Sequence, residues 1–103
     1  MPDFAADVTV ELSGDTATLA VTGDVDIVSA PSLREQLLRI DARNVVVDLA
    51  GVTFIDSSGL GVLVAALKRA REAGGELTLR SPSRPTRKVL DITGLSQLVT
   101  IED

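Results

Sequence analysis

Apolar and polar residues alternate in two short segments near the start of the chain. Apolar residues occupy every second position over 8–12 and again over 17–21, and the turn residues Ser13-Gly14-Asp15 lie between the two segments. Alternation of this kind places every second side chain on the same face of a strand. The pattern predicts two antiparallel strands joined as a hairpin.

Three later segments have the spacing of helices with one apolar face. The first runs from about Ser29 to Ile40 and opens on a capping serine and an early proline. The second begins at or just after Ser57, has apolar residues at positions 60, 63, 64 and 67, and ends before Gly74-Gly75. The third runs from Pro85 to about Thr93 and is ended by Gly94. We therefore expect three helices.

Three apolar segments between and after these helices are typical of further strands. Val45–Leu49 is an almost continuous apolar run, which favours a central strand covered on both faces; 77–79 and 98–101 are shorter. The order ββαβαβαβ predicts an α/β fold with a mixed sheet of about five strands. Because crossovers between parallel strands are right-handed, helices between strands in sequence order should all cover one face. Because the sequence contains no linker segment, residues 1–103 should form a single domain.

The composition limits the chemistry that the chain can carry out itself. It has no His and no Cys. A serine then lacks the usual neighbouring base, and a zinc ion lacks its commonest ligands. Asp24, Asp26 and Asp56 could supply oxygen ligands, but their spacing matches no EF-hand calcium loop. We expect a protein that is not an enzyme and that holds no metal or cofactor.

Charge and hydropathy also narrow the class of partner. The formal net charge is −5, and Phe4 and Phe54 are the only aromatic residues, which disfavours direct binding to nucleic acid. The first residues contain no basic segment followed by an apolar core of signal-peptide length, and no apolar run is long enough to cross a bilayer. The sequence predicts a cytoplasmic protein without a membrane contact.

The segment Asp56-Ser57-Ser58-Gly59 carries the candidate chemistry, because it connects the central strand to the second helix. The first N–H groups of a helix lack intrahelical partners and carry partial positive charge, so a phosphate added there would be stabilised. A serine there can equally be a simple helix cap. One cap is enough, so we assign Ser58 to capping or loop support. For Ser57 the residues alone leave two interpretations open, a phosphate acceptor and a helix cap. Asp56 could be a second capping acceptor, and Gly59 could lie where there is room only for a small residue.

Four segments together resemble the anti-sigma-factor antagonists of the STAS domain family: 23–26 (Gly-Asp-Val-Asp), 46–49 (Val-Val-Asp-Leu), 54–61 (Phe-Ile-Asp-Ser-Ser-Gly-Leu-Gly) and 90–95 (Leu-Asp-Ile-Thr-Gly-Leu). The resemblance implies that an anti-sigma factor, itself a serine kinase, phosphorylates Ser57. It further implies that the unphosphorylated protein binds this kinase and frees a sigma factor, and that a serine phosphatase resets the switch. The partner-binding surface would then consist of Asp24, Asp26, Asp56, Ser57, Ser58 and Gly59.

A second function remains open for a chain of this family. Some STAS domains are scaffolds or sensors that bind a partner protein or a small ligand without being phosphorylated. The presence of Ser57 in its full local context favours the phosphorylated class, because a pure scaffold has no need of a serine there.

Overall fold

The computed structural model of the protein describes residues 7–103. In this part of the chain the elements follow in the order β1 (Asp7–Ser13), β2 (Thr16–Val25), α1 (Ala30–Leu38), β3 (Asn44–Ile55), α2 (Ser57–Glu72), β4 (Leu77–Arg80), α3 (Arg84–Ile92), the single 3₁₀ turn η1 (Leu95–Gln97) and β5 (Thr100–Glu102). The strands form one sheet in the order β1-β2-β3-β4-β5, in which β1 is antiparallel to β2 and the other neighbours are parallel. The predicted α/β fold, mixed five-stranded sheet and element order are confirmed.

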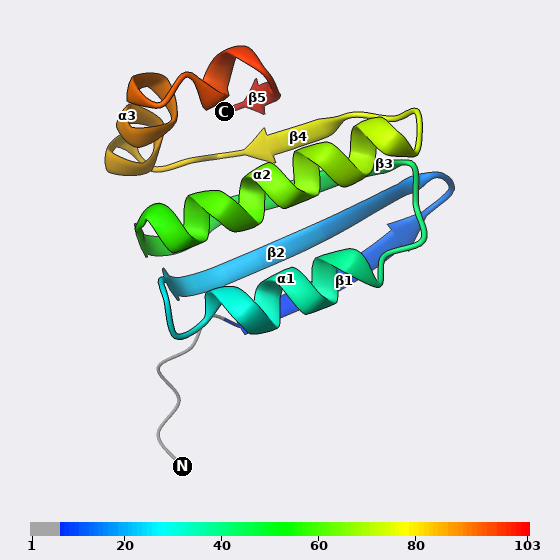
Figure 1. Cartoon of the computed structure of the whole chain (residues 1–103), viewed down its shortest axis with the longest axis horizontal. Helices are drawn as coiled ribbons and strands as arrows, with labels where there is room; N and C mark the ends of the chain where they lie inside the picture. The colour runs from blue at the N-terminus through cyan, green and yellow to red at the C-terminus, as the bar shows by residue number, and fades with distance from the viewer. Residues whose placement is uncertain (1–6) are drawn as a thin grey trace.

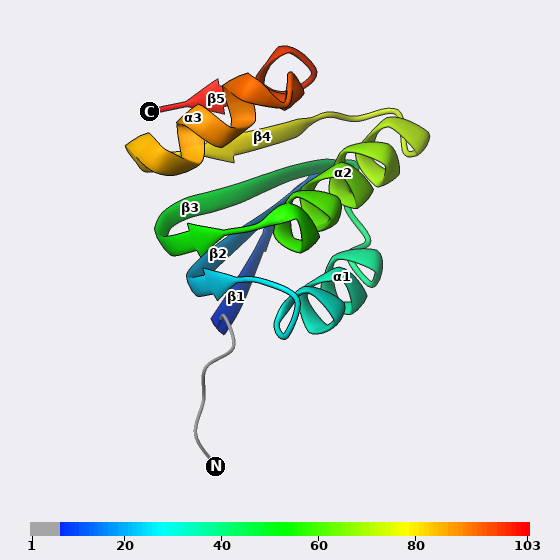
Figure 2. The same cartoon turned by 60° about the vertical axis from the view of Figure 1, so that its left-hand side comes forward.

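The helices enclose one core on one face of the sheet. Helices α1 and α2 lie side by side and run roughly along the strands (Figure 1), and the turned view shows both on the same side of the sheet (Figure 2). Helix α3 lies beside β4, at the end of the sheet where α2 begins (Figure 1). Its Leu90 is fully buried in the same apolar cluster as the residues under α1 and α2. The expectation that the helices share one face is confirmed.

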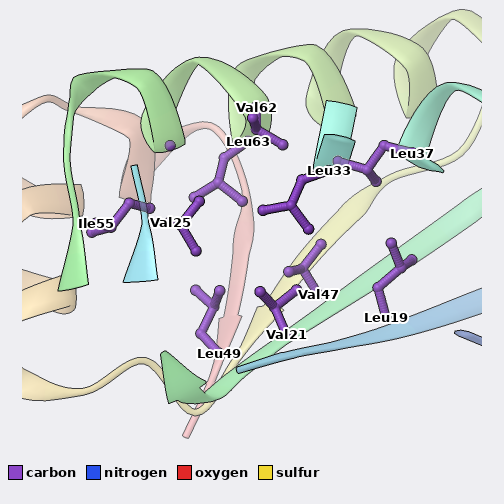
Figure 3. Close-up of a pocket in the computed structure, with 11 residues that line it drawn as sticks. Leu19, Val21, Val25, Leu33, Leu37, Val47, Leu49, Ile55, Val62 and Leu63 are labelled. Atoms are coloured by element: carbon purple, nitrogen blue, oxygen red, sulfur yellow. The ribbon is translucent and has the colours of Figure 1, made fainter. Parts of the chain in front are cut away.

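The core between the helices and the sheet is packed almost without gaps. Leu19 and Val47 of the strands meet Leu33 and Leu63 of the helices there (Figure 3). The cavity that remains among these side chains has a volume of about 20 Å³ and is lined by apolar residues. That volume is about the size of one water molecule, and an apolar cavity of this kind has no partner for a water. The core is therefore not a binding site for a small organic ligand.

Strand β3 lies in the middle of the sheet, as predicted, but the prediction that it is covered on both faces is wrong. Within residues 7–103, no helix lies over the face opposite α1 and α2. Val46 points to that face and is nevertheless buried, because Thr18 and Thr78 flank it in register on the two neighbouring strands. Cross-strand packing alone accounts for the second apolar face of this strand.

Several element ends differ from the prediction. Strands β2 and β3 extend beyond the predicted segments 17–21 and 45–49, to Val25 and Ile55. Helix α1 stops at Leu38 instead of Ile40. The last strand begins at Thr100 instead of Leu98, because Gly94 takes a left-handed conformation (φ +81°) after α3 and the chain then makes the turn η1. This turn buries Leu95 and leaves Leu98 half exposed, so the apolar run over 98–101 is only partly a strand.

Candidate functional site

The predicted site residues gather at the carboxyl ends of β2 and β3. These strands are parallel neighbours, and Asp24 and Val25 pair in register with Phe54 and Ile55. Just beyond, the backbone N–H of Asp56 donates a hydrogen bond to the carbonyl of Val25 (3.2 Å). Residues 24–29, which end β2 and lead into α1, are called the acidic turn here, and residues 56–59 are called the serine segment. The two therefore lie side by side at the carboxyl ends of the strands, where open α/β sheets commonly carry their sites.

Asp56 is the N-terminal cap of α2. Its backbone is extended (φ −111°, ψ −169°), and its carboxylate accepts hydrogen bonds from the backbone N–H groups of Ser58 (2.8 Å) and Gly59 (3.1 Å). The negative charge also lies at the positive end of the helix dipole. One side chain thus satisfies two of the free N–H groups at this helix start.

The assignment of Ser58 to capping is wrong. Ser58 is the second residue inside α2, where its backbone N–H is already bonded to Asp56, and its side chain is half buried. Asp and Ser have nearly equal preference for the capping position, so the composition of the segment could not separate them. The position of the first helical residue decides the matter: the helix begins at Ser57, which leaves the cap to the residue before it.

Ser57 is the first residue of α2, and its side chain is exposed. Within residues 7–103, the cap bonds of this helix are made by Asp56 and leave the hydroxyl of Ser57 unused. An exposed hydroxyl at a helix start is accessible to another protein and adjoins N–H groups that favour an anion.

Gly59 sets how closely α2 approaches the ends of the strands. It is buried, and a Cβ atom built there would lie 2.6 Å from both the carbonyl oxygen of Val25 and a side-chain carbon of Ile55. Such contacts are too short for any side chain. Gly59 therefore fixes the position of Ser57 by letting the first turn of α2 sit on the end of β2, which agrees with the prediction of a small residue here.

The acidic turn is held together by Asp26 and Ser29. The carboxylate of Asp26 accepts from the backbone N–H groups of Val28 (3.0 Å) and Ser29 (3.2 Å), and the Ser29 hydroxyl accepts from the N–H of Asp26 (3.0 Å). The same hydroxyl donates to the carbonyl of Asp24 (2.8 Å). The expectation that Ser29 caps α1 with its side chain is therefore wrong: the hydroxyl closes the turn before the helix and bonds to no N–H of the helix.

Asp24 lies at the outer edge of this site and is exposed. One of its carboxylate oxygens accepts the hydroxyl hydrogen of Thr53 on β3 (2.6 Å). Thr53 thus orients one carboxylate of the turn from the neighbouring strand. This pairing could not be predicted from the sequence, because the two residues are 29 positions apart.

Sequence reasoning missed the apolar part of the site. Ile27 and Val28, in the middle of the acidic turn, are 72% and 64% exposed. Beside them a groove runs between the first turns of α1 and α2, and its lining includes Arg34 and Ser58. The signal that could have revealed this surface was the position of two β-branched apolar residues between the turn-forming Asp26 and Ser29.

The three carboxylates of the site do not form a metal centre. Within residues 7–103, no group of three or more acidic side chains is arranged to hold a metal ion. The carboxylates of Asp26 and Asp56 instead accept hydrogen bonds from backbone N–H groups.

No helix in the described part of the chain is both long enough and apolar enough to span a bilayer.

A family model described as the STAS domain matches residues 7–103, which is almost the whole chain. The chain belongs to the STAS domain family. The resemblance inferred from the sequence motifs is thereby confirmed.

Two relatives and one solved structure are similar to most of this chain. An anti-sigma-B factor antagonist of Bacillus subtilis is 36% identical over 79% of this chain and 76% of its own length. An anti-sigma-B factor antagonist of Listeria monocytogenes is 34% identical over 90% of this chain and 84% of its own length. The crystal structure of an anti-sigma factor antagonist from Mycobacterium paratuberculosis superposes with a TM-score of 0.86 at 24% identity, over 98% of this chain and 88% of that chain, and so shows the same fold.

Proposed function

We propose that this STAS protein is an anti-sigma-factor antagonist whose binding is switched off by phosphorylation of Ser57. In this proposal the unphosphorylated form binds an anti-sigma factor that is also a serine kinase, and a sigma factor is released. The names of its relatives support the class of partner. The observation that carries the proposal is the exposed Ser57 at the start of α2, which the aspartate cap leaves free.

The chain is the phosphate acceptor in this scheme, and the kinase supplies the chemistry. The Ser57 oxygen attacks the γ-phosphorus of ATP, the bond to the bridging oxygen breaks, ADP leaves, and the hydroxyl proton passes to a base of the kinase. This division of labour agrees with a chain that has no His and no Cys to activate its own hydroxyl. A separate phosphatase removes the phosphate and restores binding.

The local charges support phosphorylation as the off switch. A phosphate adds about −1.5 to −2 charges at pH 7. It adds them directly after Asp56 and beside the turn that carries Asp24 and Asp26. The helix start stabilises the phosphate within this chain by roughly 0.3–1 kcal/mol, so the fold persists. A kinase surface matched to a neutral hydroxyl, however, must now desolvate a dianion, which weakens the complex.

Mass spectrometry of the intact protein tests the site of transfer. The protein is incubated with ATP and each purified serine-kinase anti-sigma factor from the genome that encodes it. We expect one phosphate on the unaltered chain and on Ser58→Ala, none on Ser57→Ala, and peptide mapping to Ser57. Transfer to Ser58, or transfer to the Ser57→Ala variant, would refute the assignment.

The proposal also defines the setting in which the protein works. Its partners are proteins, it acts in the cytoplasm, and it contacts neither nucleic acid nor membrane directly. A gel-shift titration with DNA at physiological salt should show no complex of the purified protein. The alternative of a small-ligand sensor would need a surface site, because the core cavity of about 20 Å³ is too small for a metabolite.

A further inference from the structure

The acidic turn presents two apolar side chains to solvent. Ile27 and Val28 are 72% and 64% exposed, although both are among the most hydrophobic residue types. They are adjacent and belong to the same turn, which follows β2 and leads into α1. Exposed apolar residues that occur singly are common, whereas adjacent ones that form a contiguous apolar patch are candidates for an interaction site.

Several hydrogen bonds hold the turn that carries this pair in one conformation. The Asp26 carboxylate holds the N–H groups of Val28 and Ser29, the Ser29 hydroxyl bridges Asp26 and Asp24, and the N–H of Ala30 donates to the carbonyl of Asp26 (2.8 Å). Both side chains are β-branched and therefore stiff at χ1. Holding them in place on binding costs little conformational entropy, which is the property of a preorganised anchor.

A groove adjoins the turn and leads to the serines. Its lining includes Ile27, Ala30 and Pro31 from the side of α1, and Ser58 and Val62 from α2. Ser58 is the direct neighbour of the exposed Ser57. A partner that covers both serines therefore also covers the end of the groove that Ser58 and Ile27 line.

We propose that Ile27 and Val28 are the hydrophobic anchor by which the kinase recognises this antagonist, with an apolar side chain of the kinase seated in the adjoining groove. This inference rests on the proposed function and names the partner's surface: an apolar patch bordered by basic side chains. The basic border follows from charge complementarity, because Asp24, Asp26 and Asp56 flank the apolar pair. Apolar contacts at the centre with charged groups around them are the usual arrangement of a tight interface.

A second copy of this chain fits the surface poorly. Two copies meeting through Ile27 and Val28 would bring their carboxylates Asp24, Asp26 and Asp56 against one another. Each copy also has a net charge of −5. Like charges facing one another across an interface oppose association, so a basic partner is favoured over self-association.

Titration calorimetry with a matched control tests the anchor. The unaltered protein, Ile27→Ser, Val28→Ser and Ile92→Ser are each titrated with the purified serine-kinase anti-sigma factors of the same genome, without ATP. Ile92 is a suitable control because it is 75% exposed but lies on α3, which α2 separates from α1 (Figure 1). All three residues are exposed, so the variants should fold, which thermal melting verifies.

The result that we expect is specific to the turn. Ile27→Ser and Val28→Ser should each weaken binding by roughly tenfold to a hundredfold, and Ile92→Ser by less than about twofold. If all three variants bound as tightly as the unaltered protein, or if Ile92→Ser lost as much as the others, the anchor would be refuted and the proposed function would stand. If the unaltered protein bound none of the kinases, the proposed function would fail together with the anchor.

Discussion

Helices α2 and α3 begin in different ways, and the difference explains why Ser57 is available. At α3, the cap is a serine: the Ser83 hydroxyl accepts from the N–H of Thr86 (3.4 Å) and donates to the Thr86 hydroxyl (3.0 Å). At α2, the cap is Asp56, and the serine next to it keeps its hydroxyl free. A serine that caps a helix is committed to the fold, whereas a serine that follows an aspartate cap can be modified without loss of the cap.

The third helical position differs as well. In α3 it is Thr86, a buried residue that completes the hydrogen bonds of its cap. In α2 it is Gly59, which has no room for a Cβ atom. The first turn of α2 is therefore pressed against β2 and β3, and this close approach places Ser57 next to the acidic turn. The comparison implies that the residues at the start of α2 place Ser57 beside the acidic turn, whereas those at the start of α3 only stabilise the helix.

The largest effect should come from filling the space at Gly59. Gly59→Ala forces a carbon atom against the Val25 carbonyl, so we expect it to lower the free energy of unfolding by roughly 1–3 kcal/mol. Gly61→Ala is the matched control in the same helix, since nothing lies within 4 Å of its added Cβ; it should stabilise the protein by about 0.5–1 kcal/mol. Urea unfolding of both variants measures the difference, and two stabilised proteins would show that α2 does not need close contact here.

An intermediate effect should follow the loss of either cap. Asp56→Ala removes two hydrogen bonds and a charge at the helix start, and it should cost roughly 1–2 kcal/mol. Ser83→Ala should cost less, about 0.5–1 kcal/mol, because its capping bond is single and long (3.4 Å). Chemical denaturation of the two variants compares the caps directly. A larger loss for Ser83→Ala would reverse our ranking of the two helix starts.

The smallest effects on stability should occur at the two serines of α2. Ser57→Ala and Ser58→Ala each leave the Asp56 cap intact, so each should change the free energy of unfolding by less than about 0.5 kcal/mol. Melting curves by circular dichroism, recorded beside that of Asp56→Ala, measure these changes. A marked loss for Ser58→Ala would restore Ser58 as a structural residue.

The sequence predicted the arrangement of elements better than the detail of the site. Apolar periodicity places the strands and helices, because burial of a continuous face leaves few alternatives. It could not choose between Asp56 and Ser58 as the cap, since the choice depends on the first helical residue, and such boundaries shift by a residue or two in any assignment from pattern. It could not find the exposed pair Ile27 and Val28 either, because apolar residues are by default counted toward the core.

The central claim is that phosphate on Ser57 switches off binding to the kinase. Its most direct test is calorimetric titration of the kinase with the unmodified protein and with the same protein quantitatively phosphorylated on Ser57, after circular dichroism has verified that both are folded. We predict that the phosphorylated form binds at least roughly a hundredfold more weakly, since a kinase surface matched to a neutral hydroxyl must desolvate the added dianion. Equal affinities of the two forms would contradict the account.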